Sequence, residues 1–374
     1  MRGCFSADEE QFRSEVRALL EEYRDLDGFF DHGTDAATRV HPLYRALGDR
    51  GWLSLGWPRE HGGQERSVVY EFILWDEMAY ARAARPPLAA GVVAQSIIGH
   101  GTAEQHQRFL PSIRSGEAEF CLGLSEPEAG SDLAGVRTRA VLDGDRYLVT
   151  GEKVWTSMAH AARHIWALVR TGDLESRTRG LTFFLIDLQS PGVTIRPIPT
   201  LDGGQLNEVH LDGVSVPVTD RLGEEGDGWR ILGESLVVER HVQFVPGRLR
   251  RDYDDILAWV RSVDLVTDPV VRARLADLAV GVDEVEALSV GLLAAIESGR
   301  TATAETAYNK LAGSRLSQEL ARAALDFGTP EGLVVGTPVE FLWRQSILET
   351  IGGGTSEMMR NTIARQALQL PSSG

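Results

Sequence analysis

Two segments of the sequence place hydroxyl groups, glycine and an aromatic ring where they could contact a ligand. The first is CLGLSEPEAGSD at residues 121–132, where an apolar run ends in an expected loop that contains Pro127, Gly130 and two serines. Such a loop can offer hydroxyls and backbone N–H groups to a ligand. A surface turn would explain the same residues equally well. The second, GEKVWTSMAHAA at 151–162, places Trp155 beside two hydroxyl residues at a strand end, although a buried tryptophan is the simpler interpretation of that segment alone.

A third segment, IGGGTSEMMRNTIAR at 351–365, combines three glycines with a threonine that can cap a helix. The glycines let the backbone approach a ligand closely, and the N–H groups at a helix N-terminus attract phosphate. A plain glycine-rich helix start is the alternative. No strand is expected before this segment, so the context of a Rossmann fold or of a P-loop is missing.

The sequence gives less support to a catalytic Glu-Arg pair, a metal site or a serine hydrolase site. Glu239 and Arg240 lie on an expected helix, where such a pair usually faces solvent. His160 and His164 are four residues apart in a turn-and-strand pattern, and the sequence contains neither HExxH nor CxxC, so we expect no metal site. The sequence also lacks the GxSxG elbow of a serine hydrolase.

The composition is that of a globular protein, with 374 residues, 43% hydrophobic and 25% charged. Its apolar runs fall short of the roughly 20 residues that span a bilayer, and the N-terminus lacks a signal-peptide pattern. Cys4 and Cys121 cannot form a disulfide framework, which indicates a cytoplasmic protein. The net charge of -16 argues against nucleic acid as a partner. Of 38 basic residues only Lys153 and Lys310 are lysine, a bias that a GC-rich genome would explain.

Apolar spacing divides the chain into three expected domains, 1–118, 119–222 and 223–374. In the first, a helix is expected after a capping box formed by Ser6 and Glu9. Further helices are expected near 38–50, 67–84, 87–100 and 103–115.

In the middle domain, short apolar runs separated by turn residues predict strands. These include a hairpin with an Asp143-Gly144 turn and the runs HIWALV, LTFFLIDL and VTIRPI. The last domain predicts helices at 226–260, bent at Pro246, and at 269–298, 301–326, 338–350 and 355–369. We therefore expect an α+β fold in which an N-terminal helical bundle, a β-barrel or sandwich and a C-terminal antiparallel helical bundle follow one another.

Together these segments resemble the acyl-CoA dehydrogenase family of flavoproteins. SEPEAGSD is similar to the family's TEPxAGSD signature, with Ser125 in place of threonine, and GEKVWTS is similar to its GxKxWIT segment, with Ser157 in place of threonine. GGGTSEMMRNTIAR resembles the C-terminal G-T-S/N-E/Q signature. The motifs occur in the family's order and at similar separations, so the resemblance covers nearly the whole chain.

The resemblance implies an FAD cofactor between the β-domain and the C-terminal bundle. Trp155 is expected against the ring system, and the Ser157 hydroxyl near flavin N5. The other expected cofactor contacts from these motifs are Leu122, Leu124, Ser125, Gly130, Ser131, Thr156, Thr355, Ser356 and Glu357. The expected substrate contacts are Ser131, Arg240, Gly353 and Gly354.

Two departures from the family pattern affect FAD contacts that cross between subunits. Arg261 matches an arginine that reaches a neighbour's FAD, but Ser262-Val263 stands where the family has Phe-Gly. Around Gly328 the chain lacks the family's glutamine before a Gly-Gly pair. We therefore expect an oligomer, either a homotetramer or a heteromer in which a partner chain completes the flavin site.

The resemblance also implies where the catalytic base lies. In medium- and short-chain members a glutamate precedes the G-T signature, but Gly353 occupies that position here. Isovaleryl- and long-chain-type members carry the glutamate in a Glu-Arg pair on a helix, which Glu239 and Arg240 match. We expect Glu239 to be the base and Glu349 to be a weaker alternative, while the Gly353 N–H could still hold the thioester carbonyl.

The implied activity is the introduction of an α,β double bond into an acyl thioester of coenzyme A or of an acyl carrier protein. An electron-transfer flavoprotein or a similar acceptor would take the electrons. Two alternatives stay open: a non-catalytic or partner subunit of a heteromeric acyl-CoA dehydrogenase, and a flavin oxidase or monooxygenase on the same fold.

Overall fold

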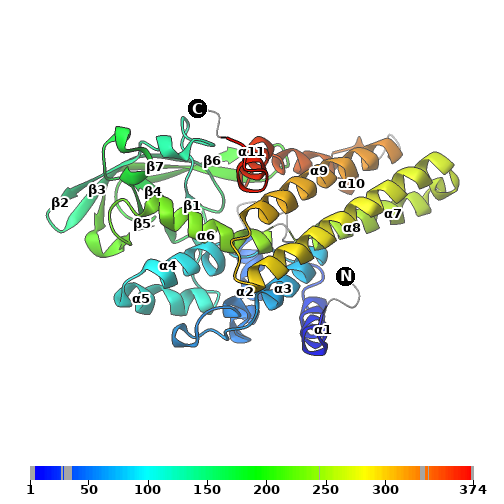
Figure 1. Cartoon of the computed structure of the whole chain (residues 1–374), viewed down its shortest axis with the longest axis horizontal. Helices are drawn as coiled ribbons and strands as arrows, with labels where there is room; N and C mark the ends of the chain where they lie inside the picture. The colour runs from blue at the N-terminus through cyan, green and yellow to red at the C-terminus, as the bar shows by residue number, and fades with distance from the viewer. Residues whose placement is uncertain are drawn as a thin grey trace. The chain divides into compact units, whose positions relative to one another are not determined.

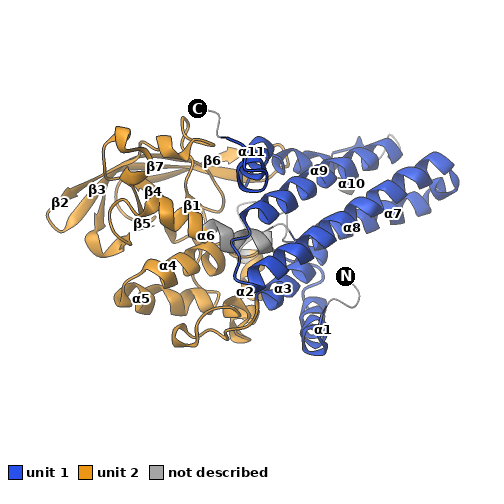
Figure 2. Cartoon of the chain, viewed as in Figure 1, with its two compact units in different colours: residues 1–29, 68–85, 240–374 blue, residues 30–67, 86–239 orange. Residues whose placement is uncertain are grey.

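The computed structural model describes residues 5–26, 28, 36–243, 245–328, 333–335 and 337–371, apart from the side chains of 36–38, 236–243 and 338. Helices, a sheet and further helices follow one another along the chain, which confirms the expected α+β fold (Figure 1). The chain forms two compact units (Figure 2). The helical unit contains residues 1–29, 68–85 and 240–374, and the sheet unit contains residues 30–67 and 86–239. The three domain boundaries expected from the sequence stay a prediction.

The strands of the sheet unit form one eight-stranded sheet within the described residues. The order across the sheet is β6-β7-β3-β2-β4-β5-β8, and β1 pairs with β4. The bounds are Phe120–Gly123 (β1), Arg139–Asp143 (β2), Arg146–Thr156 (β3), His164–Arg170 (β4), Leu181–Asp187 (β5), Val193–Pro199 (β6), Gln205–Pro217 (β7) and Arg221–Leu222 (β8).

Two parts of the sheet bear directly on the sequence predictions. Strands β4 and β5 are buried along almost their whole length, as their continuous apolar runs predict, and Trp166 stacks on Phe183 with ring centroids 3.7 Å apart. The β2–β3 hairpin is confirmed, but Asp143 is the last residue of β2 and pairs with Arg146. The two-residue turn is therefore Gly144-Asp145 rather than Asp143-Gly144, and Gly144 has a φ of 65° there.

The helices lie close to the predicted segments. Their bounds are Ala7–Glu21 (α1), Ala36–Asp49 (α2), Val68–Tyr80 (α3), Ala94–His100 (α4), Ala103–Arg114 (α5), Gly228–Gln243 (α6), Gly247–Ser262 (α7), Pro269–Glu297 (α8), Thr303–Phe327 (α9), Pro338–Leu348 (α10) and Ser356–Gln366 (α11). The capping box of Ser6 and Glu9 is present at the start of α1. The expected bent helix at 226–260 is two helices, and Pro246 is the N-cap of α7. Proline lacks the N–H that a continuous helix would need at this position.

Helices α7, α8 and α9 share one apolar core in the helical unit. Leu249, Ile256 and Val260 repeat at helical spacing along α7 and pack with residues of α8 and α9. Gly247 begins α7 beside α3, where a Cβ atom would lie 2.0 Å from the carbonyl oxygen of Asp76. Only glycine allows α3 and α7 to approach this closely.

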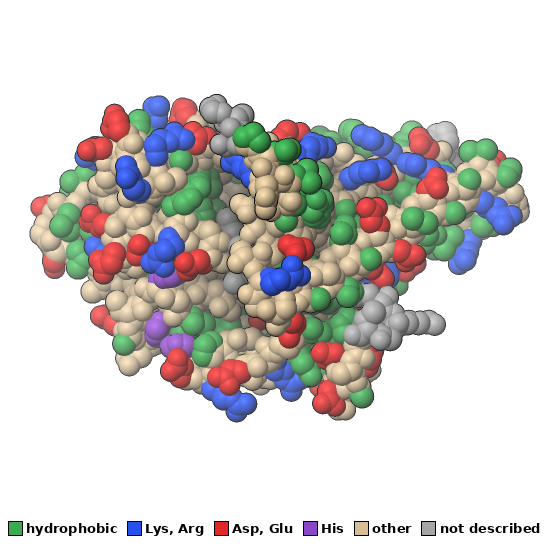
Figure 3. All heavy atoms as spheres, viewed as in Figure 1, with side chains coloured by type: hydrophobic (Ala, Val, Ile, Leu, Met, Phe, Trp, Pro, Cys, Tyr) green, Lys and Arg blue, Asp and Glu red, His purple; other side chains and the backbone are tan. Residues whose placement is uncertain are grey.

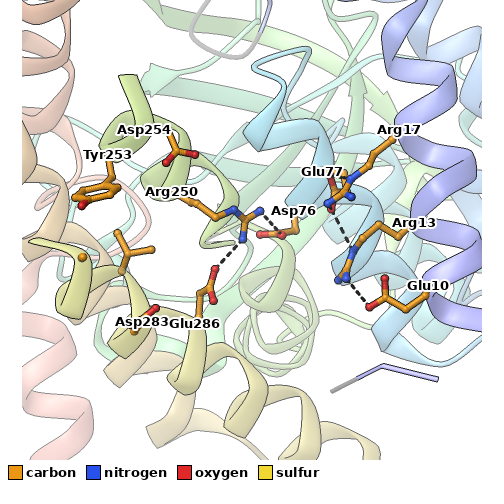
Figure 4. A pocket seen from close by; sticks show the side chains of 12 residues that line it. Glu10, Arg13, Arg17, Asp76, Glu77, Arg250, Tyr253, Asp254, Asp283 and Glu286 are labelled. Carbon is orange, nitrogen blue, oxygen red and sulfur yellow. Dashed lines mark hydrogen bonds and ion pairs between the residues drawn. The ribbon is translucent and has the colours of Figure 1, made fainter. Parts of the chain in front are cut away.

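A pocket of about 570 Å³ in the helical unit is lined by charged side chains of α1, α3, α7 and α8 (Figure 4). Arg250 points between two acids, 3.0 Å from Asp76 and 2.8 Å from Glu286. Arg17 holds both oxygens of Glu77 at 2.8 Å. We call Asp76, Glu77, Arg250 and Glu286 the helical charge cluster; these residues join segments distant in the sequence through side-chain ion pairs.

Acidic and basic side chains are spread over the face of the molecule drawn in Figure 3, rather than separated by sign. In the part of the chain that the structure describes, we find no helix that is both long enough and apolar enough to cross a membrane.

Candidate active site

The structure brings the first two motifs together in the sheet unit. Strand β1 leads into the loop 124–132, and β3 runs beside that loop. The Val154 N–H donates a 3.0 Å hydrogen bond to the carbonyl of Ser125. Residues 121–132 and 151–157, which the sequence separates, are therefore parts of one local structure.

A buried lysine joins the same two motifs. The Lys153 side chain is fully buried, and its Nζ donates to Glu126 Oε1 at 2.7 Å, to the Leu168 carbonyl at 2.6 Å and to the Leu124 carbonyl at 3.2 Å. These three acceptors match the three donors of an ammonium group. We call Lys153, Glu126 and the two carbonyls the Lys153 cluster.

Glu126 is equally well paired. Its carboxylate also accepts from the backbone N–H groups of Arg137 at 2.7 Å and Thr138 at 3.0 Å. Burial works to raise the pKa of Glu126, but the Lys153 ammonium and these hydrogen bonds outweigh it and hold the pKa below its ordinary value. Burial lowers the pKa of Lys153 to about 8, against the opposing effect of Glu126. Sequence interpretation had not singled out this pair.

Trp155 stands out from the strand two residues after Lys153. The β3–β7 register shifts between Lys153 and Thr156, so β3 carries a bulge there. Trp155 has a φ of 62° and is 59% exposed, whereas Val154 and Thr156 on either side are buried. The buried tryptophan favoured by the segment alone is therefore wrong, because the bulge turns this side chain outward. A bulky residue in the left-handed region stores backbone strain, which is common at functional sites.

Behind Trp155, the strand is held by side-chain hydrogen bonds from β7. The buried Asn207 donates to the carbonyl of Thr156 at 2.9 Å. Thr156 Oγ1 is itself buried and has no hydrogen-bond partner among the described residues. Ser157 is half-buried beside it.

The loop 124–132 exposes the other expected contacts. Glu126 and Ala129 form an isolated bridge around a tight turn, which leaves Gly130 and Ser131 exposed. A Cβ atom at Gly130 would meet no other group within 4 Å. Leu122, on β1, and Leu124 and Ser125, at the start of the loop, are half-buried.

The third motif belongs to the helical unit. Gly353 and Gly354 have φ values of 66° and 98° in the turn between α10 and α11. Thr355 is the N-cap of α11, and its hydroxyl accepts from the Met358 N–H at 3.2 Å. Ser356 donates its N–H to the Thr350 carbonyl at 3.0 Å, and Glu357 forms an exposed pair with Arg360. The expected turn and helix start are thus in place.

The remaining expected contacts lie at helix ends. Arg261 is exposed in the last turn of α7, and Gly328 is the C-cap of α9. The expected contacts of Arg261 and Gly328 with the FAD of another subunit stay a prediction.

The expected base lies on α6, but the side chains of Glu239 and Arg240 fall outside the described residues. Glu349, the alternative base, is the C-cap of α10. Its carboxylate lies 3.6 Å from the guanidinium of Arg248 and is largely buried. Glu349 therefore already has a charged partner within the helical unit.

These features fit the expected FAD. The exposed Trp155 offers a flat aromatic face, and the space beside Gly130 admits a ligand. The turn at Gly353 and Gly354 and the capped N-terminus of α11 suit close approach by a polar or phosphate-containing group.

Comparisons with known proteins agree with this geometry. Three family models match in order: acyl-CoA dehydrogenase N-terminal domain over 6–117, middle domain over 121–214 and C-terminal domain over 226–368. The chain is 33% identical to acyl-CoA dehydrogenase IpdE1 of Mycobacterium tuberculosis, with 97% of this chain and 98% of that protein covered.

Two solved structures are also similar over the full length. The Tcur3481-Tcur3483 steroid ACAD is 31% identical with a TM-score of 0.91 and covers 99% of both chains. A chain of the ChsE4-ChsE5 complex from Mycobacterium tuberculosis is 32% identical with a TM-score of 0.89 and covers 100% of both. This chain therefore belongs to the acyl-CoA dehydrogenase family and is an FAD-dependent oxidoreductase that acts on CH–CH groups.

Proposed function

We propose that the protein introduces an α,β double bond into an acyl thioester, with Glu239 as the base. The observation that carries this proposal is the exposed Trp155, held by a bulge beside Ser157 and the loop 124–132. An exposed indole in a strained backbone conformation is costly unless a ligand covers it. The bound FAD supplies the hydride acceptor.

The residues of this chain would supply binding and proton transfer. Glu239 would remove the α-proton and Arg240 would hold the base in place. The Gly353 N–H would donate to the thioester carbonyl, where negative charge develops. Ser157 would donate its hydroxyl to the flavin ring, and Thr355, Ser356 and Glu357 would meet the dinucleotide part.

The pairing of Glu349 with Arg248 supports Glu239 over the alternative base. To reach a substrate, the Glu349 carboxylate would have to leave this guanidinium. Glu239 occupies a helix position that matches the family's Glu-Arg pair, and Gly353 offers no side chain at the other known position.

We further propose that the substrate is a coenzyme A thioester with a bulky acyl group of the steroid-derived class. One full-length solved relative is a steroid ACAD. Electrons would pass to an electron-transfer flavoprotein or a similar acceptor.

A second candidate is a partner subunit that shares its flavin site with another chain. The similarity to a chain of the ChsE4-ChsE5 complex favours this candidate. So does Ser262-Val263 after Arg261, where the family has Phe-Gly. Purification separates the two candidates: the first protein is yellow when expressed alone, and the second takes up FAD only with its partner.

The decisive test is Glu239→Gln, which keeps the size of the side chain but removes its basic oxygen. Substrate-driven loss of the visible flavin absorbance should slow by about 10²–10⁴-fold, the usual contribution of a positioned base. FAD should stay bound. The additional change Gly353→Glu should restore part of the rate if both positions face the same α-carbon. A Glu239→Gln protein that reduces its flavin at nearly the wild-type rate excludes this base.

A further inference from the structure

Both lysines of this chain are buried and donate hydrogen bonds to backbone carbonyls. Thirty-eight basic residues include only Lys153 and Lys310 as lysines, and both side chains are fully buried, with exposed fractions of 0% and 1%. Lysine is seldom buried, because desolvating an ammonium group is costly unless it is fully paired. A genome that favours arginine codons accounts for the missing surface lysines but not for the burial of the two that remain.

Residues 124–126 are bound by the side chain of Lys153 and by the backbone N–H of Val154. The Lys153 Nζ donates to Leu124 and Glu126, and the next N–H along the chain, that of Val154, donates to the carbonyl of Ser125. Trp155 follows at once in the bulge. The Lys153 cluster therefore connects the strand residues just before the indole to the loop 124–132.

Lys310 binds the backbone just before the third motif. It lies on α9, and its Nζ donates at 2.8 Å to the carbonyl of Glu349, at the C-terminal end of α10. A cation at this end of a helix satisfies a carbonyl that the helix leaves unpaired. Gly353 and Gly354, which have positive φ values, follow Glu349 by four and five residues.

A compact ammonium suits the position of Lys153 better than a guanidinium. The Lys153 cluster presents three acceptors around one nitrogen, which a planar fork with five donors does not match. Both lysines also reach backbone carbonyls, so each fixes a chain segment rather than only another side chain.

We propose that Lys153 and Lys310 are positioning residues of the flavin site: Lys153 sets the place of Trp155 against the loop 124–132, and Lys310 sets the turn at Gly353 that meets the thioester. This inference rests on the proposed function. Neither lysine is a proton donor or acceptor in the reaction.

Lys153 is tested by the double variant Lys153→Met/Glu126→Gln. The single change would leave a buried carboxylate without its cation, so the double change removes the pair together and protects the fold. FAD affinity should fall about tenfold or more, which corresponds to about 1.4 kcal/mol of binding free energy or more. The visible circular dichroism of the bound flavin should also change.

The matched control is Arg108→Met/Asp220→Asn. This ion pair joins α5 to the segment between β7 and β8 in the same unit, and it contacts neither motif. The thermal stability of this control should fall less, because Arg108 is partly exposed. Its FAD affinity should stay within about threefold of wild type, as expected for a site that shares no partners with it.

Lys310 is tested by Lys310→Met, with Arg344→Met/Glu340→Gln on α10 as the control. An enoyl thioester, the product, is titrated into the FAD-loaded proteins while the flavin spectrum is followed. Product affinity should fall about tenfold in Lys310→Met, since misplaced contacts are lost, whereas FAD affinity changes less. The control should bind product as wild type does.

The outcomes separate this inference from the proposed function. If the wild-type protein binds FAD and bleaches with a thioester while both lysine variants behave like their controls, the positioning role is excluded and the function stands. If only stability changes, both lysines are scaffold residues. If the wild-type protein takes up no FAD, alone or with a partner chain, the proposed function fails and the lysine assignment fails with it.

Discussion

The Lys153 cluster and the helical charge cluster are both networks of buried charges, but they hold different things. In the helical charge cluster, Arg250 of α7 bridges a carboxylate of α3 and one of α8, and Arg17 of α1 pairs with the cluster's Glu77 on α3 (Figure 4). In the Lys153 cluster, the ammonium binds two backbone carbonyls and a carboxylate that itself binds two backbone N–H groups. The first network clamps helices, whereas the second shapes a loop beside an exposed, strained tryptophan. Burial of charge alone does not mark a functional site; what the charge holds in place does.

Breaking the helical charge cluster should have the largest effect on stability. Arg250→Met leaves Asp76 and Glu286 without their shared cation, so we expect the free energy of unfolding to fall by about 3–5 kcal/mol. Denaturant titration of the purified protein measures this loss. Arg251→Met removes a partly exposed pair with Asp255 on the same helix and should cost about 0–1 kcal/mol. Equal effects of the two variants would contradict the clamp assigned to Arg250.

Trp155 and Trp166, both in the sheet unit, sharpen the contrast between scaffold and site. Trp155→Ala should lower FAD affinity about tenfold, because a stacked aromatic contact and its buried area are lost. Its free energy of unfolding should stay within about 1 kcal/mol, as is usual for surface positions. Trp166→Ala, in the buried centre, should cost about 3–5 kcal/mol. Fluorescence titration with FAD and denaturant unfolding measure the two quantities; unchanged FAD affinity in Trp155→Ala would exclude the stacking role.

One carboxylate from each cluster, Glu126 and Asp76, should respond to acid in opposite directions. The pKa of Glu126 lies below its ordinary value of 4.5, so the stability it contributes is present above that pH and is lost as the pH falls through the folded-state pKa. Burial, opposed by Arg250, raises the pKa of Asp76 above its ordinary value of 3.8. The folded protein therefore holds that proton more tightly than the unfolded chain, and stability rises as the pH falls through this raised pKa.

Paired variants measure this difference. From pH 6.5 down to 4, the stability advantage of wild type over Glu126→Gln should begin to shrink, whereas its stability relative to Asp76→Asn should grow. Parallel curves for the two variants would show that the carboxylates are in equivalent environments and would remove the contrast.

The smallest change to the protein is expected from brief treatment with an amine-reactive reagent, which should leave both buried lysines largely unmodified. With both lysines buried, acylation of the native protein at Lys153 and Lys310 should be at least about 10²-fold slower than at a surface lysine, because it requires the protein to open. Arg315→Lys provides that surface lysine, since the Arg315 side chain is 78% exposed. Peptide mass spectrometry after brief labelling reads out each site. Rapid native labelling of Lys153 would contradict its place in the cluster.

Much of the fold could be predicted from local sequence patterns. The capping box at Ser6, the apolar runs of β4 and β5 and the helical spacing of Leu249, Ile256 and Val260 all depend on neighbours in the sequence. The three motifs likewise identify the family, since each is a contiguous run of residues. Two of the errors are local: Pro246 separates two helices instead of bending one, and the hairpin turn lies one residue later than predicted.

The sequence by itself determined the order of helices and strands, the family and its cofactor, because periodicity, capping and motif identity are properties of short segments. Only the tertiary structure decided that Trp155 is exposed, that Lys153 binds Glu126 and that Lys310 binds the carbonyl at the C-terminal end of α10. These features depend on residues brought together from distant parts of the chain. A bulge set by the pairing of β3 with β7 turns the indole outward, and no pattern within residues 151–162 contains that partner strand. Burial and pairing of charge are likewise non-local, which is why two rare lysines could be counted in the sequence but placed only in the fold.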